Sequence, residues 1–204
     1  MHAFVTRIPG GKREREAESV RKDYSFTCLE LFSGLGGMAR GIASADFAHV
    51  GLVESNAKAV ETLRRNGWSR VVARDAYAVD YESYAPQQLD LIAGGPPCQP
   101  WSIMGTQKGA SDERDGWPCC LRAVRRARPK AFLFENVPGM LAPGAPAAFV
   151  ETLLSCFRRL GYDVDVHTAL AANYRVPQLR KRIFVVGLRR ELRGTFTPGG
   201  DNAN

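Results

Sequence analysis

The loop formed by residues 94–102, Gly-Gly-Pro-Pro-Cys-Gln-Pro-Trp-Ser, constrains this chain more than any other segment. It follows directly on the mainly apolar segment Leu89–Ala93, so we expect it to leave the C-terminal end of a buried strand. Open α/β sheets bind their ligands at that end. Two glycines and two prolines predict a rigid, sharply turned loop, because Gly permits unusual φ angles while Pro fixes φ and removes an N–H. Cys98 in this setting indicates a nucleophilic thiol, and an ordinary buried cysteine is the alternative.

Apolar and amphipathic segments alternate along the chain and predict an α/β fold. The strand candidates are Phe26–Phe32, His49–Glu54, Arg70–Asp75, Leu89–Ala93, Ala131–Glu135, Tyr162–Leu170 and Arg182–Leu188. The helix candidates are Met38–Ala45, Ala57–Arg65, Trp117–Ala127 and Pro146–Leu160. This alternation predicts a Rossmann-like, mainly parallel sheet of about seven strands with helices on both faces. Only about a dozen residues without a helical pattern join the last two strands, which favours a long hairpin and one antiparallel strand.

Composition narrows the class of protein. A chain of 204 residues with 45% hydrophobic residues suits one domain, which we place at residues 26–204 behind a charged, mobile tail of residues 1–25. The net charge of +7 favours a polyanionic partner. Five cysteines without CxxC spacing or a neighbouring His cluster indicate neither a disulfide framework nor a metal site. Without an apolar run of membrane-spanning length or a signal-peptide core, we expect a soluble protein of a reducing cytosol.

A glycine-rich segment follows the first predicted strand. Residues 33–39, Ser-Gly-Leu-Gly-Gly-Met-Ala, form a G-x-G-x-x-A pattern between a strand and a helix. Glu54 ends the second strand about 20 residues after Gly34, where an acid can bind ribose hydroxyls. Strand, glycines, helix and acid together indicate a nucleoside cofactor, although the glycines alone are weak evidence. Asp75 ends the third strand and suits either an adenine amino group or the cap of a helix.

Charged residues accompany two later strands. Glu135 ends the strand expected beside the cysteine loop, which predicts a shared site, and a solvated carboxylate is the alternative. Gln178, Arg180 and Arg182 alternate in sequence, so an extended chain would point all three to one face. The alternative there is a solvated basic edge. Residues 121–130 carry five basic residues and no acid, which fits a solvated helix face and phosphate contacts equally well.

The FSGLGG, GGPPCQPWS, ENV and QLRKR segments together resemble the ordered motifs of the DNA (cytosine-5) methyltransferases, over roughly Thr27–Leu188. The resemblance implies S-adenosylmethionine as cofactor and a cytosine flipped out of double-stranded DNA as target. It implies Cys98 as the nucleophile, Glu135 as partner of the cytosine ring, and Gln178, Arg180 and Arg182 as supporting polar groups. The residues that match cofactor-contacting positions are Phe32, Gly34, Gly36, Glu54, Asp75, Pro97 and Trp117. Asp112 and Arg114 lie in a segment that resembles the loop closing over flipped DNA.

The sequence departs from the usual pattern of that family at Arg175 and in the length that follows the last predicted strand. Arg175 follows Tyr174 where the family usually has Gly, which leaves the local turn open. The family also continues into a target-recognition region and two further motifs, whereas about 15 residues follow the last predicted strand here. We therefore expect the catalytic part of a cytosine-5 DNA methyltransferase, completed by a second polypeptide, in a bacterial cytosol or nucleoid or in a eukaryotic nucleus. A non-catalytic remnant that binds DNA or a partner, and a tRNA cytosine-5 methyltransferase, are the alternatives.

Overall fold

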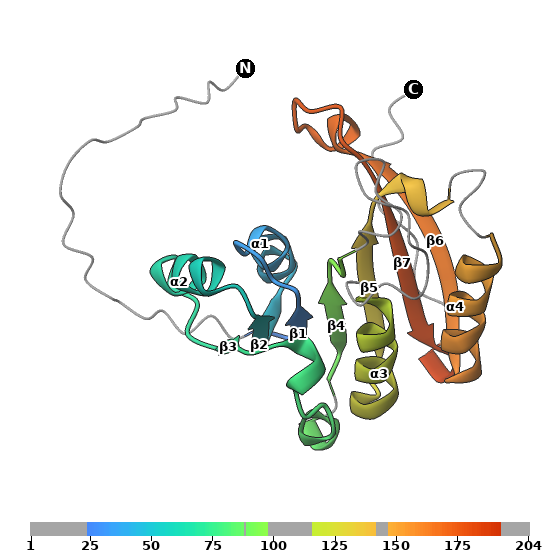
Figure 1. The fold of residues 1–204 in the computed structure, drawn as a ribbon, viewed down its shortest axis with the longest axis horizontal. Coiled ribbons are helices and arrows are strands. Elements are labelled where there is room, and N and C mark those ends of the chain that lie inside the picture. Colours follow the sequence, from blue (N-terminus) through green and yellow to red (C-terminus); the bar gives the residue numbers. More distant parts are fainter. Residues whose placement is uncertain (1–23, 88, 98–115, 142–146, 193–204) are drawn as a thin grey trace.

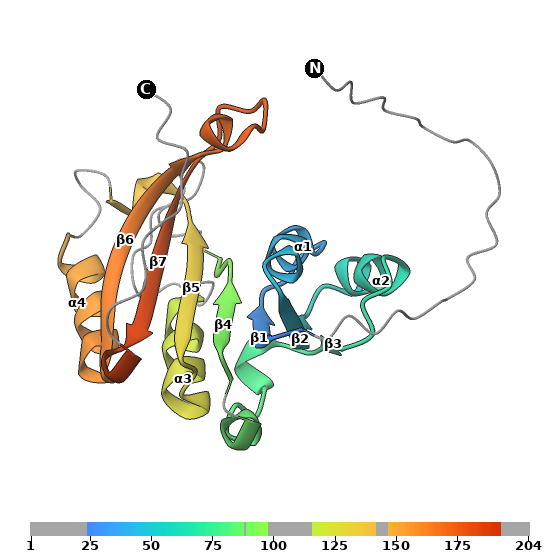
Figure 2. The same cartoon turned by 180° about the vertical axis from the view of Figure 1, so that it is seen from behind.

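A computed structural model describes residues 24–87, 89–97, 116–141 and 147–192, which contain a seven-stranded sheet (Figures 1 and 2). Its strands are β1 (Phe26–Leu31), β2 (Phe47–Glu54), β3 (Val71–Ala73), β4 (Leu91–Gly94), β5 (Ala131–Asn136), β6 (Tyr162–Leu170) and β7 (Lys181–Arg189). They lie in the order β3-β2-β1-β4-β5-β7-β6. Neighbouring strands from β3 to β5 are parallel, and β7 runs antiparallel to both β5 and β6. The predicted mainly parallel sheet with one antiparallel strand is confirmed.

Four α-helices accompany the sheet in the described ranges. They are α1 (Gly37–Ser44), α2 (Ala57–Arg65), α3 (Trp117–Ala127) and α4 (Ala147–Arg159). Short 3-10 helices connect these elements or follow the last strand: η1 (Ala76–Ala78), η2 (Glu82–Gln87), η5 (Pro138–Leu141), η6 (Ala171–Tyr174) and η7 (Arg190–Leu192). The sequence did not predict these turns, because they are too short to show a helical period. None of the described helices has the length and apolar character needed to cross a membrane.

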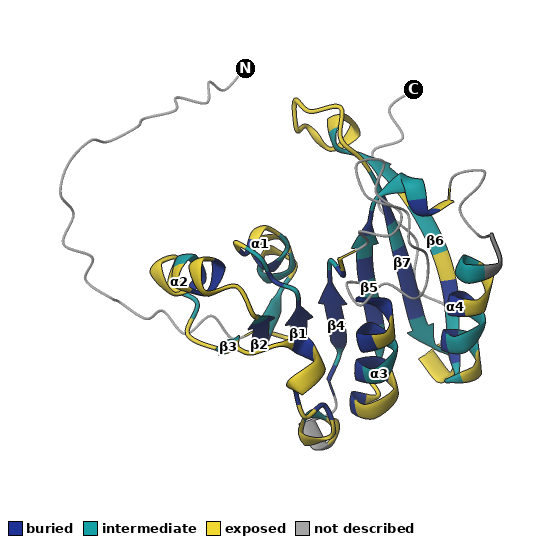
Figure 3. Cartoon of the chain, viewed as in Figure 1, coloured by how far each residue is buried: buried dark blue, intermediate teal, exposed yellow. Residues whose placement is uncertain are grey.

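The central strands β1 and β4 bury both of their faces, as Figure 3 shows by their dark colour, whereas β6 is mostly half-buried or exposed. Leu29, Phe132 and Phe134 belong to the large core cluster that also contains residues of α3 and α4. The alternate residues Cys28 and Leu133 belong instead to a cluster that includes Met38 and Ile42 of α1. Successive side chains of a strand point to opposite faces, so the helices cover the sheet from both sides.

The hairpin of β6 and β7 differs in detail from the prediction. The two strands pair from Tyr162 with Arg189 to Leu170 with Lys181, and residues 171–180 project beyond their ends (Figure 1). Because β7 begins at Lys181, the expectation that Gln178, Arg180 and Arg182 share one extended strand is wrong. The Gln178 N–H donates to the Val176 carbonyl at 2.7 Å, which turns the chain just before the strand.

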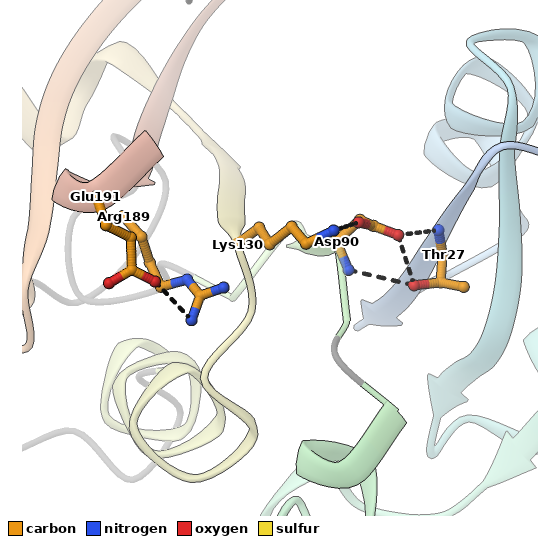
Figure 4. A network of polar contacts seen from close by, with 5 residues as sticks. All are labelled: Thr27, Asp90, Lys130, Arg189 and Glu191. Atoms are coloured by element: carbon orange, nitrogen blue, oxygen red, sulfur yellow. Dashed lines mark hydrogen bonds and ion pairs between the residues drawn. The ribbon is translucent and has the colours of Figure 1, made fainter. Parts of the chain in front are cut away.

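A polar network joins the N-terminal ends of the central strands (Figure 4). The Asp90 carboxylate accepts hydrogen bonds from Thr27, through the backbone N–H at 2.8 Å and the hydroxyl at 3.0 Å. Lys130 Nζ donates to the other carboxylate oxygen at 2.7 Å. These contacts tie β1, β4 and β5 together at the end of the sheet opposite the cysteine loop.

Candidate active site

The glycine turn, residues 33–37, carries the chain from β1 into α1. Phe32, Gly34 and Gly36 all have positive φ, at 55°, 53° and 87°. A Cβ at Gly36 would lie 2.8 Å from Leu63 Cδ2, so only Gly fits there. A Cβ at Gly34 would meet nothing within 4 Å, so the space beside this residue is open. Glycine is favoured there by the positive φ angle of the backbone, and not by a lack of space. The turn is thus closely packed beneath Gly36 and open beside Gly34.

Two acids lie at the ends of the neighbouring strands β2 and β3: Glu54 is the last residue of β2, and Asp75 follows the end of β3 by two residues. Glu54 accepts the Gly34 N–H through Oε2 and the Asn56 N–H through Oε1, both at 2.8 Å. A carboxylate has about four acceptor sites, so these two bonds fix Glu54 and leave it able to accept from hydroxyl groups. Asp75 Oδ1 accepts the Tyr77 N–H at 2.8 Å and caps η1. The structure therefore gives Asp75 the capping role that the sequence left open.

The residues expected to line the cofactor come together from three segments. The Gly116 N–H donates to the Pro97 carbonyl at 3.1 Å. A Cβ at Gly116 would lie 2.6 Å from Pro97 Cδ and 3.2 Å from Phe32 Cζ, so these groups are in contact distance of one another. Trp117 is fully buried and packs edge-on against Phe134, with ring centroids 5.9 Å apart. Its indole belongs to the core, and its contact with a cofactor stays a prediction.

Glu135 and two arginines meet at the end of β5. Arg182 Nε lies 2.7 Å from Glu135 Oε1, and a guanidinium nitrogen of Arg180 lies 3.8 Å from the same oxygen. A Cβ at Gly95 would lie 3.5 Å from Oε2, so the second oxygen faces the start of the cysteine loop. The sequence correctly placed Glu135 beside that loop. Gln178 is exposed on the projecting segment, and among the described residues no hydrogen bond or ion pair joins its side chain to Glu135.

Cys98, Asp112 and Arg114 lie outside the described residues, but the start of the loop is well defined by Asn136. The Asn136 side chain is 3% exposed and donates to the Pro96 carbonyl at 3.2 Å. Its oxygen accepts the Val137 N–H at 2.8 Å. This role of Asn136 was not predicted from the sequence, although its position directly after Glu135 on a strand predicts a side chain on the opposite, buried face.

Two basic residues of α3 have structural partners. Arg122 donates to the carbonyls of Tyr77 at 2.5 Å and Val79 at 3.2 Å, and its guanidinium lies 5.3 Å from the Tyr81 ring centroid. Arg126 forms an ion pair with Glu82. The sequence allowed either a solvated helix face or phosphate contacts for the basic residues of this segment. Arg122 and Arg126 instead make contacts within the chain.

A hollow of about 630 Å³ opens beside Glu135 on the face formed by β5, β7 and β6. Its walls include the apolar side chains of Leu133, Phe184 and Val186. Glu135, Arg180 and Arg182 also line it. Within the described ranges, no residue of α1–α4 contributes to its lining. The carboxylate and its arginines therefore border a largely apolar space at the sheet edge.

Comparisons with known proteins show to which family the chain belongs. Residues 26–202 match the model of the C-5 cytosine-specific DNA methylase family. The chain is 39% identical over 173 residues to the type II methyltransferase M.NgoMIV of Neisseria gonorrhoeae, covering 84% of this chain and 54% of that protein. It is 41% identical over 162 residues to M.AplI of Arthrospira platensis, covering 78% of this chain and 44% of that protein.

Solved structures show the same fold. A DNA modification methyltransferase encoded within a prophage of E. coli superposes with a TM-score of 0.69 at 28% identity, over 85% of this chain and 49% of that one. DNMT2 of Spodoptera frugiperda superposes with a TM-score of 0.68 at 21% identity, over 85% of this chain and 53% of that one. The chain belongs to the C-5 cytosine-specific DNA methylase family and spans about half the length of these relatives.

Proposed function

We propose that this chain carries the catalytic part of an enzyme that transfers a methyl group from S-adenosylmethionine to carbon 5 of cytosine in double-stranded DNA. The observation that carries the proposal is the placement of Glu135. One of its oxygens is held by Arg182 at 2.7 Å, and the other faces the start of the loop that continues to Cys98. The glycine turn and Glu54 lie at the same end of the parallel sheet.

The residues around the glycine turn fit the proposed cofactor. The open space beside Gly34 admits a ligand, and Glu54 has acceptor capacity for ribose hydroxyls. Phe32 and Pro97 supply an apolar wall, and we assign to Asp75, which also caps η1, a contact with the adenine amino group. When bound, S-adenosylmethionine supplies an electrophilic methyl group on a sulfonium sulfur.

The chemistry of cytosine explains the other residues. Carbon 5 is a poor nucleophile, so the Cys98 thiolate first adds to carbon 6 and pushes electron density onto carbon 5. Glu135 donates a proton at N3, where negative charge develops, and Arg182 holds Glu135 in place. Arg180 and Arg182 supply positive charge that favours the thiolate over the thiol. Loss of the carbon 5 proton after methylation expels Cys98 and restores the ring.

DNA must be held and its sequence recognised while the cytosine is flipped. We propose that a region outside residues 26–192, in the same polypeptide or in a second one, supplies this recognition and completes the cofactor pocket. The half-length match to the relatives and the apolar hollow beside Glu135 support the proposal. The net charge of +7 fits sequence-independent contact with the DNA backbone, whose affinity should fall steeply with salt.

Trapping with 5-fluorocytosine tests the reaction. Addition of the Cys98 sulfur to carbon 6 followed by methyl transfer leaves fluorine on carbon 5, which cannot depart as a proton does. With S-adenosylmethionine and duplex DNA containing 5-fluorocytosine, we expect a covalent adduct that maps to Cys98 by peptide mass spectrometry. Cys98→Ser should give none, and Cys156→Ser should react like the wild type, because Cys156 lies on α4.

Three outcomes would contradict the proposal. An adduct at Cys119 or Cys120 would remove Cys98 from its role. An adduct formed with fluorinated tRNA in place of DNA would favour the RNA alternative. Absence of any adduct, after a recognition region from the relatives is supplied, would favour a non-catalytic homologue.

A further inference from the structure

A buried carboxylate lies under the glycine turn and takes no part in the proposed chemistry. Glu30 of β1 is 1% exposed and pairs in register with the buried Ala93 of β4. A carboxylate in such a position must have partners, because burying it unpaired is costly. His49 Nε2 of β2 lies 3.0 Å from Glu30 Oε2, and the backbone amide of Ala39 donates a hydrogen bond to the same carboxylate.

The bond to Ala39 matters because α1 has no cap of its own. Gly36 occupies the N-cap position, makes no side-chain cap bond, and no acidic residue lies in the first turn. The first amides of a helix lack partners within the helix. Glu30, on the strand beneath, supplies an acceptor for the amide of Ala39, which lies three residues after Gly36. It thereby fixes the first turn of α1 to β1.

Trp68 reaches the same turn from the other side. Its indole packs edge-on against the His49 ring, with centroids 5.1 Å apart at 71°. It also lies directly beneath Gly36, where a Cβ would stand 3.1 Å from Trp68 Nε1. Glu30, His49 and Trp68 thus form one continuous set of contacts that supports the turn at Gly36 and at Ala39.

The two ring nitrogens of His49 have different surroundings. Nε2 lies 3.0 Å from Glu30 Oε2, within hydrogen-bond distance. Nδ1 is buried and has no hydrogen-bond partner among the described residues. The contact with Glu30 is therefore the polar contact that positions the His49 ring against the carboxylate.

We propose that Glu30, His49 and Trp68 are positioning residues that hold the glycine turn and the first turn of α1 in the shape that receives the cofactor. This inference rests on the proposed function in assigning S-adenosylmethionine to that turn. Glu30 acts through the Ala39 amide and Trp68 acts through Gly36. Neither side chain is expected to touch the cofactor itself.

Three variants test the cluster. Glu30→Ala removes the acceptor of the Ala39 amide, and Glu30→Gln keeps an acceptor oxygen while removing the charge. Asp90→Ala is the matched control, since it removes a hydrogen-bonded carboxylate at the opposite end of the central strands. Hydrogen exchange of amides 34–40 without ligand, referenced to amides of β6, and calorimetry with S-adenosylmethionine are the two readouts.

In Glu30→Ala we expect amide 39 to exchange at least about tenfold faster and the dissociation constant to rise about tenfold, which corresponds to one lost hydrogen bond to a charged group. Glu30→Gln should restore both to within about twofold, and Asp90→Ala should change neither relative to β6. Should Glu30→Ala fail to fold, Trp68→Ala gives the same test at Gly36, with a rise in dissociation constant of about threefold.

Equal effects in Glu30→Ala and Asp90→Ala would overturn the proposal, because general destabilisation would then explain them. Failure of Glu30→Gln to rescue exchange at amide 39 would also overturn it. A wild-type chain that does not bind S-adenosylmethionine even when a recognition region from the relatives is supplied, with exchange behaving as expected, would overturn the proposed function while leaving the structural contact in place.

Discussion

The two ends of the central strands use the same residue types in different ways. At the N-terminal ends, Asp90 is hydrogen-bonded to Thr27 and Lys130, and each partner belongs to a neighbouring strand or its start (Figure 4). At the C-terminal ends, Glu135 has one oxygen bound by Arg182, while the other faces the cysteine loop beside a hollow. Both oxygens of Asp90 are bonded within the fold, whereas one oxygen of Glu135 faces the loop where we propose that a ligand binds.

This contrast separates residues that stabilise the sheet from residues that act on a ligand. A group whose bonding capacity is filled by its own chain contributes to the free energy of unfolding. A group directed at an open space contributes little to stability and more to binding or catalysis. Substitutions at the two ends should therefore affect different measurements.

The largest expected effect is at the C-terminal ends of the strands, where Glu135 lies. Arg182→Ala frees Glu135 from its 2.7 Å partner and removes a positive charge, so methyl transfer should fall by about 100-fold or more. The midpoint of urea unfolding should change little, because Arg182 lies at the open rim. Single-turnover transfer of tritiated methyl, with the recognition region supplied, measures the rate. A variant with the wild-type rate would show that Glu135 needs no orientation by Arg182.

The next effect concerns the glycine turn. Glu54→Ala should weaken S-adenosylmethionine binding by about 1–3 kcal/mol, the range for hydrogen bonds to charged groups. The loss has two sources, the ribose hydroxyls and the released Gly34 amide. Calorimetry measures it, and Glu61→Ala, which removes an exposed partner of Arg65, is the control. Unchanged affinity would make Glu54 a structural acceptor only.

At the N-terminal ends of the strands, a substitution should lower the free energy of unfolding and leave the affinity for S-adenosylmethionine unchanged. Asp90→Ala leaves the Thr27 N–H and Lys130 without their acceptor, so the free energy of unfolding should fall by about 1–2 kcal/mol. Affinity for S-adenosylmethionine should stay at the wild-type value. Urea denaturation and calorimetry on the same sample check both statements. A parallel loss of affinity would mean that the two ends are coupled through the strands.

Much of this arrangement could be predicted from the sequence. The apolar segments gave every strand and helix to within a few residues, and α2 and α3 matched in full. Glu54 and Glu135 were predicted to lie at the C-terminal ends of the parallel strands, because the carboxyl ends of such strands meet on one side of the sheet. These predictions succeeded because each depends on a local pattern and a general rule of topology.

The rest depends on contacts between segments far apart in the chain. Asn136 bonds to Pro96, and Arg122 bonds to carbonyls more than 40 residues away. The pairing of Glu30 with His49 requires the register of β1 and β2, which includes an irregularity after Cys28. No local pattern encodes such partners. The same limit explains why Gln178 and Arg180 were wrongly expected to share an extended strand with Arg182, since the turn before β7 depends on contacts of Val176 with Ala171 and Gln178.

A smaller effect is expected at Arg175, which adopts φ 62° where the family usually has Gly. A side chain in this left-handed conformation costs roughly 1–2 kcal/mol, while Gly loses about 0.5–1 kcal/mol through the flexibility of the unfolded chain. Arg175→Gly should therefore be more stable than Arg175→Ala by roughly 0.5–1 kcal/mol. Comparing these two variants removes the contribution of the arginine contacts. Urea unfolding that ranks Ala above Gly would contradict a backbone origin.

The smallest effect is a difference in pH dependence between Asp90 and Glu30. Burial alone would raise the pKa of Asp90, but hydrogen bonds from Lys130 and Thr27 outweigh it and lower the pKa. Burial raises the pKa of Glu30, and hydrogen bonds from His49 and Ala39 offset this only in part. The two carboxylates should therefore contribute to stability with opposite signs as the pH changes.

The contribution of Asp90 is complete above the ordinary pKa of Asp, about 3.9, and is lost as pH falls through the lowered folded pKa. That of Glu30 is complete below the ordinary pKa of Glu, about 4.3, and is lost as pH rises through the raised folded pKa. Urea unfolding from about pH 3 to about pH 7 tests this. As pH rises, Asp90→Asn should lose stability relative to the wild type and Glu30→Gln should gain it. Slopes of the same sign would show that the carboxylates at the two ends are held in equivalent environments.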